Sequence, residues 1–307
     1  MDKDITSPFF SIVIPTYNRA LLIGKTIDSI LQQQYANYEI IVVDDGSNDN
    51  TEEILKKYSA TNFTYVKKEN GERAAARNYG TKLAKGKYIN WFDSDDIMFP
   101  NHITEARKMI RKYNEVEIFA LGFQVQNNNG TIVQRSTYSL PTINKIMYRG
   151  NHLACNPVFV RRDIALQNLF NEDRALTVSE DFELWLRMAA RFPIYCTNTI
   201  TSALIIHNER SMITMNTEEK LIPRFEKVNQ LVIDDKRVAQ FLGTKKELFL
   251  AINYMLLSST LAIAGYKKQA INFSFKAIGL SKLVLFKKTF FVTVWYLSPF
   301  KRSHLKN

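Results

Sequence analysis

The sequence predicts an α/β fold, with a parallel sheet covered by helices on both faces, followed by a C-terminal helical region. Apolar runs of strand length alternate with helical segments through the first hundred residues, which is typical of parallel strands joined by helices. Polar residues gather where three of these strands end, as they do at the ligand sites of such sheets. After Met215, apolar residues recur at helical spacing.

Residues 1–110 alternate between strand and helix. The strand segments are short and rich in β-branched residues, as expected of buried strands. In the first helix, the apolar residues fall mostly on one face. We predict strands at residues 9–15, 39–43, 63–66 and 88–92, and helices at residues 21–33, 51–58, 73–84 and from 100 onward.

The rest of the chain is less regular. We predict strands at residues 117–123, 157–160 and 203–206, with residues 131–138 pairing back as an antiparallel strand. A helix begins near residue 179, and residues 144–152 are ambiguous. Helices are expected at residues 221–241, 246–264 and 267–280, where they form a small bundle.

Residues 281–300 combine bulky aromatic side chains with lysines, and Lys301, Arg302 and Lys306 follow. This composition suits a segment that lies on an anionic bilayer. It suits a docked C-terminal helix equally well, and the sequence leaves both interpretations open.

The composition limits the classes of partner and function that the chain can have. The chain has 307 residues and a formal net charge of +11, which favours an anionic partner without choosing among nucleic acid, a membrane surface and a small molecule. The sequence holds no zinc finger, aromatic ribonucleoprotein motif or long arginine tract, so we expect no nucleic acid partner. Cys155 and Cys196 form no Cys-x-x-Cys pair and are expected to be small core residues in a reducing compartment.

The N-terminus lacks a basic segment that leads into an apolar run, so a signal peptide is not expected. The sequence has no run of about 18 uninterrupted apolar residues, and a membrane-spanning helix is not expected either. The lack of a signal peptide and the cysteine usage favour a cytoplasmic protein.

The strand at residues 88–92 ends in three carboxylates, Asp93, Asp95 and Asp96, with Ser94 between them. If this segment is extended, Asp93 and Asp95 point the same way and repel each other unless a cation lies between them. Carboxylate oxygens suit Mg²⁺ or Mn²⁺, which often bind substrate phosphates as well. The alternative is an acidic turn that caps the next helix.

Two more predicted strands end in polar turns. The first is followed by Pro15, Thr16, Tyr17, Asn18 and Arg19, and the second by residues 44–47. Because the carboxyl ends of parallel strands share one edge, we expect these turns to converge with the carboxylates. The sequence holds neither Gly-x-Gly-x-x-Gly nor the P-loop motif, which counts against dinucleotides and P-loop NTPases.

Several of these residues could contact a nucleotide. Asp45 could accept a hydrogen bond from a base, and Tyr17 could lie against a planar ring. Arg77 and Asn78 could reach a base or phosphate from the third predicted helix. The alternatives are a solvated helix face for Arg77 and simple packing for Tyr17.

A second acidic group, Glu180, Asp181 and Glu183, falls in the first turn of the helix that begins near residue 179. Acidic residues there stabilise the helix dipole, but a carboxylate at a helix start could also act as a general base. His207 follows an apolar strand and could be a metal ligand, a phosphate contact or merely a hydrogen-bonded histidine.

Taken together, residues 11–19, 39–47, 76–80, 93–96 and 179–187 resemble motifs of the family 2 glycosyltransferases of the GT-A fold. The resemblance covers roughly the first 215 residues. It implies a catalytic domain at residues 1–215 with a mixed central sheet. This domain has a Rossmann-like nucleotide-binding half at 1–110 and an acceptor-binding half at 111–215. Residues 216–307 would be a separate helical region with a candidate membrane-contacting segment.

The resemblance also implies the chemistry. It predicts an inverting transfer of a sugar from a nucleoside diphosphate donor, often a UDP-sugar, to a hydroxyl. Asp181 would be the base, with Glu180 its alternative. Mn²⁺ or Mg²⁺ would be held by Asp93, Asp95 and Asp96, with His207 nearby. The nucleotide-sugar would contact Pro15, Thr16, Tyr17, Asn18, Arg19, Asp44, Asp45, Arg77, Asn78, Asp93, Ser94 and Asp95.

The leading hypothesis is therefore a hexosyl- or N-acetylhexosaminyltransferase of bacterial surface polysaccharide synthesis, acting on a glycan or lipid-linked acceptor. It would be cytoplasmic, with peripheral contact at the inner face of the cell membrane through residues 281–307. The alternatives are a metal-dependent sugar nucleotidyltransferase and a non-catalytic module that binds nucleotide-sugars.

Overall fold

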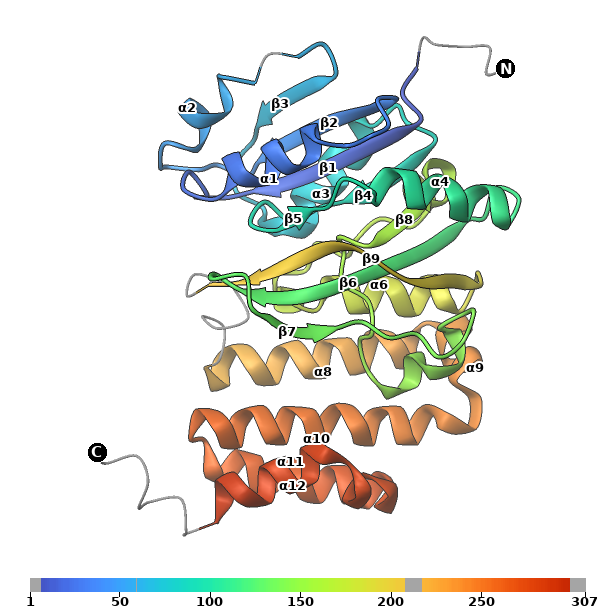
Figure 1. Ribbon diagram of the computed structural model, residues 1–307. Helices are drawn as coiled ribbons and strands as arrows, with labels where there is room; N and C mark the ends of the chain where they lie inside the picture. The colour runs from blue at the N-terminus through green and yellow to red at the C-terminus, as the bar shows by residue number, and fades with distance from the viewer. Residues whose placement is uncertain (1–6, 59, 208–216, 299–307) are drawn as a thin grey trace. The chain divides into compact units, whose positions relative to one another are not determined.

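The computed structural model describes residues 7–58, 60–207 and 217–298 (Figure 1). These residues form two compact units. One comprises the chain up to residue 144 together with residues 152–207, and the other comprises residues 145–151 and the chain from residue 217 onward. The expected boundary between residues 215 and 216 lies outside the described residues.

The first unit is built on a sheet with the strand order β3-β2-β1-β4-β8-β6-β9-β5, with β7 paired to β6. Strands β1 to β4 are mutually parallel, whereas β8 runs antiparallel to β4 and β6. This mixed sheet confirms the predicted fold class. The strands are β1 (Phe10–Thr16), β2 (Tyr38–Asp44), β3 (Phe63–Lys67), β4 (Tyr88–Trp91), β5 (Ile97–Met98), β6 (Ile118–Asn127), β7 (Ile132–Arg135), β8 (Val158–Arg161) and β9 (Ile194–Ile206).

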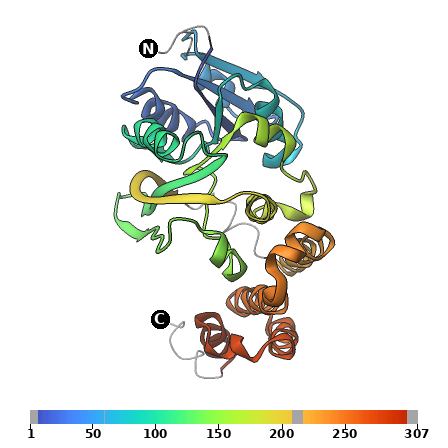
Figure 2. The same ribbon diagram turned by 90° about the vertical axis from the view of Figure 1, so that its right-hand side faces the viewer.

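Helices cover both faces of this sheet. Apolar residues of α1 and α4 join one core cluster with Phe10, Ile12 and Ile14 of β1, and these two helices lie on the same side of the sheet (Figure 2). The helices of this unit are α1 (Ile23–Leu31), α2 (Thr51–Leu55), α3 (Glu72–Leu83), α4 (His102–Lys112), α5 (Arg162–Gln167), the 3-10 helix η2 (Arg174–Leu176) and α6 (Glu180–Ala189).

Helix α3 packs closely on the opposite face. A Cβ atom at Gly80 would overlap the side chain of Val13 in β1, so the helix reaches this depth only because residue 80 has no side chain. On the same face, the Trp91 indole donates a hydrogen bond to Thr81 Oγ1 at 2.9 Å. This packing fixes α3, and the site residues that it carries, against the sheet.

Strand register brings three turns to one edge of the sheet. Thr16 of β1 is paired with Asp44 of β2, and the Asp45 N–H donates to the Thr16 carbonyl at 2.8 Å. The Phe92 N–H, just after β4, donates to the carbonyl of Val13 in β1 at 2.9 Å. The turns after β1, β2 and β4 therefore meet at the shared carboxyl edge, as predicted from the strand order.

The second unit is helical, and its helices are seen end-on in Figure 2. They are the 3-10 helix η1 (Asn144–Arg149), which begins in the first unit, α8 (Glu218–Asp234), α9 (Lys236–Leu242), the 3-10 helix η3 (Gly243–Lys245), α10 (Lys246–Ala264), α11 (Lys267–Leu280), the 3-10 helix η4 (Lys282–Phe286) and α12 (Lys288–Leu297). Helix α10 lies at the centre and packs against α8, α11 and α12.

The prediction of one helix over residues 221–241 is wrong. The backbone at Asp235 is extended, and its side chain accepts hydrogen bonds from the N–H groups of Arg237 and Val238, which caps a new helix. The short elements β5 and α5 were not predicted either, because segments of two and six residues carry too little periodicity. The antiparallel pairing of β7 with β6 is confirmed.

One stretch of the described residues, Lys236–Ala264, is long and apolar enough to cross a membrane. The sequence had not predicted this, because polar residues interrupt its apolar run. In the structure, 67% of its most apolar window is buried within the protein, which is also what a core helix of a soluble protein shows. Length and hydropathy alone are weak evidence for a membrane span.

His102, at the start of α4, is fully buried between the rings of Phe92 and Phe159. Its Nδ1 lies 2.8 Å from Thr201 Oγ1, and burial lowers the pKa of the imidazole to about 3. An unfolded chain has an ordinary histidine pKa of about 6.5. The imidazole is therefore neutral in the folded protein at pH values where the unfolded chain already takes up a proton.

This difference makes stability depend on pH between 6.5 and 3. Below pH 6.5 the unfolded state binds the extra proton, so stability falls as the pH falls. When the pH falls from 7.5 to 5.5, we expect the buried His102 to lower the free energy of unfolding by about 1 kcal/mol. Urea unfolding at both pH values should show a smaller loss for His102→Asn than for the wild type. Equal losses in the two proteins would contradict the assignment.

Candidate active site

The turn after β4 does not have the predicted geometry. Strand β4 ends at Trp91, and residues 94–96 form a turn, so Asp93 and Asp95 do not alternate along an extended strand. The expectation that they share a face for that reason is wrong. Asp93 instead accepts a hydrogen bond from Arg77, whereas Asp95 contacts His207.

Asp96 is fully buried, and both of its carboxylate oxygens accept hydrogen bonds. The Asn156 side chain donates to Oδ2 and the Ile205 N–H donates to Oδ1, both at 2.7 Å. Asn156 also accepts a hydrogen bond from the Asp93 N–H at 2.8 Å, and so it holds both ends of the turn. This geometry speaks against Asp96 as a metal ligand and gives it a structural role in fixing the turn.

A buried arginine joins two of the predicted acidic groups. Arg77 of α3 is 2% exposed, and its two terminal nitrogens donate to Asp93 Oδ1 and Glu180 Oε1, each at 2.8 Å. Arg73, one turn earlier on α3, lies 3.7 Å from the same Glu180 oxygen. The alternative of a solvated helix face is therefore wrong for Arg77. The guanidinium ties the start of α6 to the turn after β4.

The charge state of this cluster follows from its surroundings. Burial lowers the pKa of Arg77, but the neighbouring Asp93 and Glu180 carboxylates raise it, and its pKa ends well above the ordinary value. Burial raises the pKa of the Cys155 thiol well above its usual range, so this thiol is neutral. The charges that hold Arg77 are therefore the two carboxylates.

Asp181 lies near the same cluster of charged side chains. Together with Asp93 and Glu180, its carboxylate raises the pKa of the Cys155 thiol, so all three acidic groups lie within electrostatic reach of that sulfur. Asp181 is partly exposed, whereas Glu180 is buried beside Arg77. The Asp181 Oδ1 accepts a hydrogen bond from the Phe182 N–H at 2.7 Å. Of the two candidate bases, Asp181 is thus the more accessible.

Backbone strain accompanies this site. Val178, just before α6, has φ of +78°, which is unfavourable for a β-branched residue. Asn18 and Glu72 also have positive φ, in the turn after β1 and at the start of α3. Such conformations persist only where the surrounding structure imposes them, and they cluster at functional sites.

Asp95 and His207 form the second polar contact of the site. His207 Nε2 lies 2.9 Å from Asp95 Oδ2, and Arg19 Nε lies 3.6 Å from the same oxygen. The described residues contain no ready group of three His, Cys, Asp or Glu side chains for a metal ion. A carboxylate beside an imidazole nevertheless fits Mn²⁺ or Mg²⁺, because substrate phosphates often complete their coordination.

The turns after β1 and β2 hold the predicted nucleoside contacts. Asp44 accepts from the Ser47 N–H at 2.7 Å and from the Tyr65 hydroxyl at 2.8 Å, so its carboxylate braces the turn. Asp45 accepts from Lys68 Nζ at 2.8 Å and from the Gly71 N–H. Both are buried. Their contact with a nucleoside stays a prediction.

The remaining predicted contacts differ in exposure. Tyr17 is 44% exposed at the edge of the sheet, so it is not simply packed away. The buried Thr16 Oγ1 has no hydrogen-bond partner among the described residues, and Ser94 is buried in the turn after β4. Asn78 exchanges hydrogen bonds with the Phe170 backbone in both directions, which gives it a structural role.

Two buried residues beside the candidate active site were not identified from the sequence. Asn156 and Cys155 precede β8 and were not connected with the acidic turn, which lies some sixty positions earlier in the chain. The only available signal was an asparagine directly before the predicted strand at residues 157–160. Lys68, the partner of Asp45, was also missed, because a lysine after a short strand is usually exposed.

Comparison with known proteins decides the family. The model of glycosyl transferase family 2 matches residues 11–170, which is more than half of the chain. The chain belongs to glycosyl transferase family 2. The matched region contains the turns after β1, β2 and β4 and most of the residues that these turns contact. The family also counts against the nucleotidyltransferase alternative.

Relatives of this glycosyltransferase support the assignment. An uncharacterised glycosyltransferase of Rickettsia prowazekii is 31% identical over 232 residues, which are 74% of this chain and 72% of that protein. One of Rickettsia felis is 34% identical over 67% of this chain, but that is only 36% of the longer relative. The Escherichia coli UDP-Glc:alpha-D-GlcNAc-diphosphoundecaprenol beta-1,3-glucosyltransferase is 33% identical over 57% of this chain and 68% of that protein.

Solved structures show the same GT-A fold. Staphylococcus aureus TarS, residues 1–349 in complex with UDP-GlcNAc, has a TM-score of 0.63 and 17% identity, covering 89% of this chain and 91% of that one. The Pyrobaculum calidifontis mannosyltransferase PcManGT, in complex with GDP-Man and Mn²⁺, has a TM-score of 0.58 and 18% identity, covering 96% and 86%. The low identities mean that this likeness establishes the fold alone.

Proposed function

We propose that this family 2 glycosyltransferase transfers a hexose or N-acetylhexosamine, with inversion, from a UDP-sugar to a hydroxyl of a glycan or lipid-linked acceptor. The observation that carries the proposal is the buried Arg77, which joins Asp93 of the acidic turn to Glu180 at the start of α6. It keeps the residues predicted to meet the diphosphate next to the residue predicted to be the base. A UDP-sugar is the donor of the Escherichia coli relative and the ligand of TarS.

The roles of the residues follow from the reaction. The acceptor oxygen attacks the anomeric carbon from the face opposite the diphosphate, and Asp181 takes the hydroxyl proton. The bond from the anomeric carbon to the diphosphate oxygen breaks, and its electron pair leaves with the nucleoside diphosphate. One displacement inverts the anomeric centre, which has oxocarbenium character as in glycoside hydrolysis.

The leaving diphosphate develops negative charge that must be neutralised. Asp93 and Asp95, with His207, are the residues that would hold Mn²⁺ or Mg²⁺, which supplies this neutralisation when bound. Arg19 adds a positive charge at the same edge, near Asp95. Asp96 is left out of this ligand set, because its carboxylate is occupied by Asn156 and Ile205.

The proposed place in the cell follows from the acceptor. A lipid-linked acceptor of bacterial surface polysaccharide synthesis is met at the inner face of the cell membrane. A cytoplasmic enzyme with peripheral membrane contact through residues 281–307 fits this acceptor. The relatives support this class, because one acts on a diphosphoundecaprenol-linked sugar and another is a minor teichoic acid biosynthesis protein of Bacillus subtilis.

Calorimetry with UDP-glucose, UDP-GlcNAc and GDP-mannose tests the donor and the metal together. We expect a UDP-sugar to bind in the presence of Mn²⁺ and to bind at least tenfold more weakly after chelation, because two carboxylates near a diphosphate repel it without a cation. Asp95→Asn should show the same weakening. The matched control is Asp163→Asn, which removes an exposed carboxylate paired with Arg161.

Three results would count against the proposal. Absence of metal-dependent binding to all three donors would reject the donor site. An unchanged affinity in Asp95→Asn would reject the assigned ligand. Binding without transfer to any hydroxyl acceptor, in a screen by product mass, would favour the non-catalytic module instead.

A further inference from the structure

Positive charge is concentrated at the C-terminal end of this chain. Residues 248–307 contain nine lysines and arginines and no aspartate or glutamate, which accounts for nine of the eleven net positive charges. Within the described part of this stretch, Lys276 pairs with Glu226 of α8 at 3.0 Å. The other lysines there are Lys267 and Lys268 of α11, Lys282 of η4, Lys287 between η4 and α12, and Lys288 of α12.

The same three elements expose large aromatic side chains. Phe275 of α11 is 71% exposed, Phe286 of η4 is 81% exposed, and Phe291 and Trp295 of α12 are 63% and 62% exposed. Four aromatic rings in water on neighbouring elements are costly unless a partner covers them. They were not buried by the folding of this unit, although α11, η4 and α12 all pack on α10.

Helix geometry explains why these rings face outward. Ala270 and Ala277 of α11 are buried, and the Ala270 carbonyl accepts a hydrogen bond from Ser258 of α10 at 2.6 Å. Phe275 is two positions from Ala277, which is about 200° around the helix. On α12 the buried residue is Thr293, next to Met255 of α10, and Phe291 is two positions away in the same manner.

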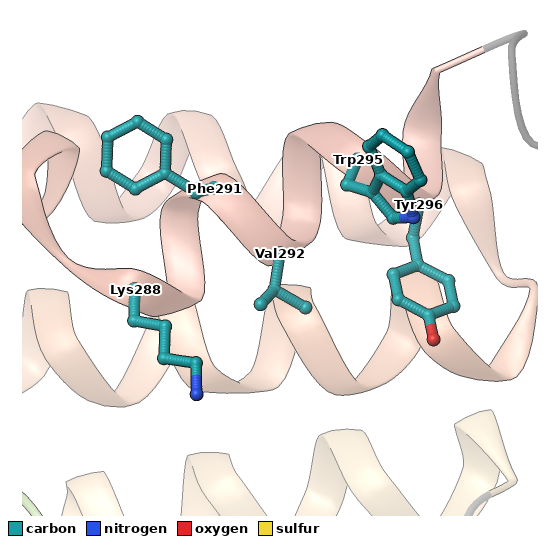
Figure 3. Close-up of a pocket in the computed structure, with 5 residues that line it drawn as sticks. All are labelled: Lys288, Phe291, Val292, Trp295 and Tyr296. Carbon is teal, nitrogen blue, oxygen red and sulfur yellow. The ribbon is translucent and has the colours of Figure 1, made fainter.

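The side chains of α12 combine both kinds of chemistry in one shallow hollow of about 500 Å³. In Figure 3, Phe291 and Trp295 project from one side of the helix, whereas Lys288, Val292 and Tyr296 project from the other. All five line the hollow. A lysine ammonium beside aromatic rings suits a boundary at which one side is anionic and the other is apolar.

We propose that the outward faces of α11, η4 and α12 form a docking surface for an anionic lipid bilayer. Charge complementarity selects this occupant, because lysines without acidic neighbours in sequence are attracted to anionic headgroups while the rings enter the headgroup and acyl boundary. A second copy of the same surface would bring like charges together. The surface refines the proposed membrane contact by adding α11, and it does not depend on the transfer reaction.

Tryptophan fluorescence offers a local readout. The chain has three tryptophans, and Trp91 and Trp185 are buried in the first unit, so Trp295 alone is placed to respond to lipid. The full chain is titrated with phosphatidylcholine vesicles that contain no anionic lipid or about 30% phosphatidylglycerol, a composition with a strong negative surface potential. We expect a blue shift and co-sedimentation only with phosphatidylglycerol, both lost in 0.5 M salt because the attraction is screened.

Two variants separate the contributions of charge and rings. Replacing Lys282, Lys287 and Lys288 with glutamine should weaken vesicle binding at least tenfold, as should Phe291→Ser with Trp295→Ser. The matched controls are Lys56, Lys82 and Lys85 to glutamine, and Ile132→Ser with Val133→Ser, which remove exposed lysines and exposed apolar side chains from the first unit. Circular dichroism melts confirm that each variant is folded.

Four outcomes overturn the proposal. They are no binding to either vesicle, equal binding to both, an equal loss in a surface variant and its control, and binding that resists both salt and substitution. The last would point to insertion of Lys236–Ala264 instead. Donor binding, measured without vesicles, remains a separate test of the proposed function.

Discussion

Replacing Arg77 with methionine is expected to lower the free energy of unfolding by about 3–5 kcal/mol, the cost of breaking a buried ion pair from one side. The side chains of Arg77 and Glu180 are 2% and 4% exposed, so water cannot take over the lost contact. Methionine fills a similar volume but leaves the Glu180 and Asp93 carboxylates facing each other without their shared cation. Urea unfolding followed by near-ultraviolet circular dichroism measures the change.

The matched control for this substitution is Arg73→Met on the same helix. Arg73 is 30% exposed and lies 3.7 Å from Glu180, so its loss should cost less than about 1 kcal/mol. Adding Glu180→Gln to Arg77→Met should restore part of the stability, because one of the two unpaired charges is removed. Equal unfolding midpoints for Arg77→Met and Arg73→Met would show that the buried contacts do not hold the site together.

Asp181→Asn is expected to reduce the turnover number by about 10³-fold, the usual effect of removing a general base. The asparagine keeps the shape of the side chain and an oxygen that can accept the Phe182 N–H hydrogen bond, so α6 should still begin at the same residue. The donor should bind within twofold of the wild-type affinity, because the change lies on the acceptor side. Product mass and donor calorimetry on the same protein measure the two effects.

The control for Asp181→Asn is again Asp163→Asn, which removes one carboxylate from an exposed ion pair. It should leave both turnover and donor affinity unchanged. Full transfer by Asp181→Asn would reject Asp181 as the base and direct attention to Glu180. A loss of donor binding together with turnover would instead assign Asp181 to the donor site.

Much of the fold followed from the sequence, because its signals are local. A β-branched run followed by a helical segment predicts a parallel unit, and the paired register of Thr16 with Asp44 shows why polar turns after such strands meet. The same local rules predicted the antiparallel return of β7 from β6. They failed at residue 235, where one aspartate cap divides a continuous periodic segment into two helices.

The organisation of the site could not be predicted in the same way, because it rests on contacts between distant parts of the chain. Arg77 and Glu180 are 103 positions apart, and Asn156, which donates a hydrogen bond to Asp96 Oδ2, is 60 positions from Asp96. Each residue type has a more common exposed role, and only the packed structure reveals that both carboxylate oxygens of Asp96 are occupied. The motif spacing indicated which acidic residues matter but not which of them remain available to a ligand.

The ion pairs of Arg77 have a consequence for protein engineering. The pair with Glu180 crosses from the proposed nucleotide-binding half before residue 110 to the proposed acceptor-binding half after it. A chimaera that takes residues 111–207 from a relative in order to change acceptor preference must therefore supply a matching acidic residue at position 180. Without it, the chimaera would contain a buried guanidinium that has lost one of its ion-pair partners. Candidate relatives can therefore be screened for an acidic residue at this one position before any gene is built.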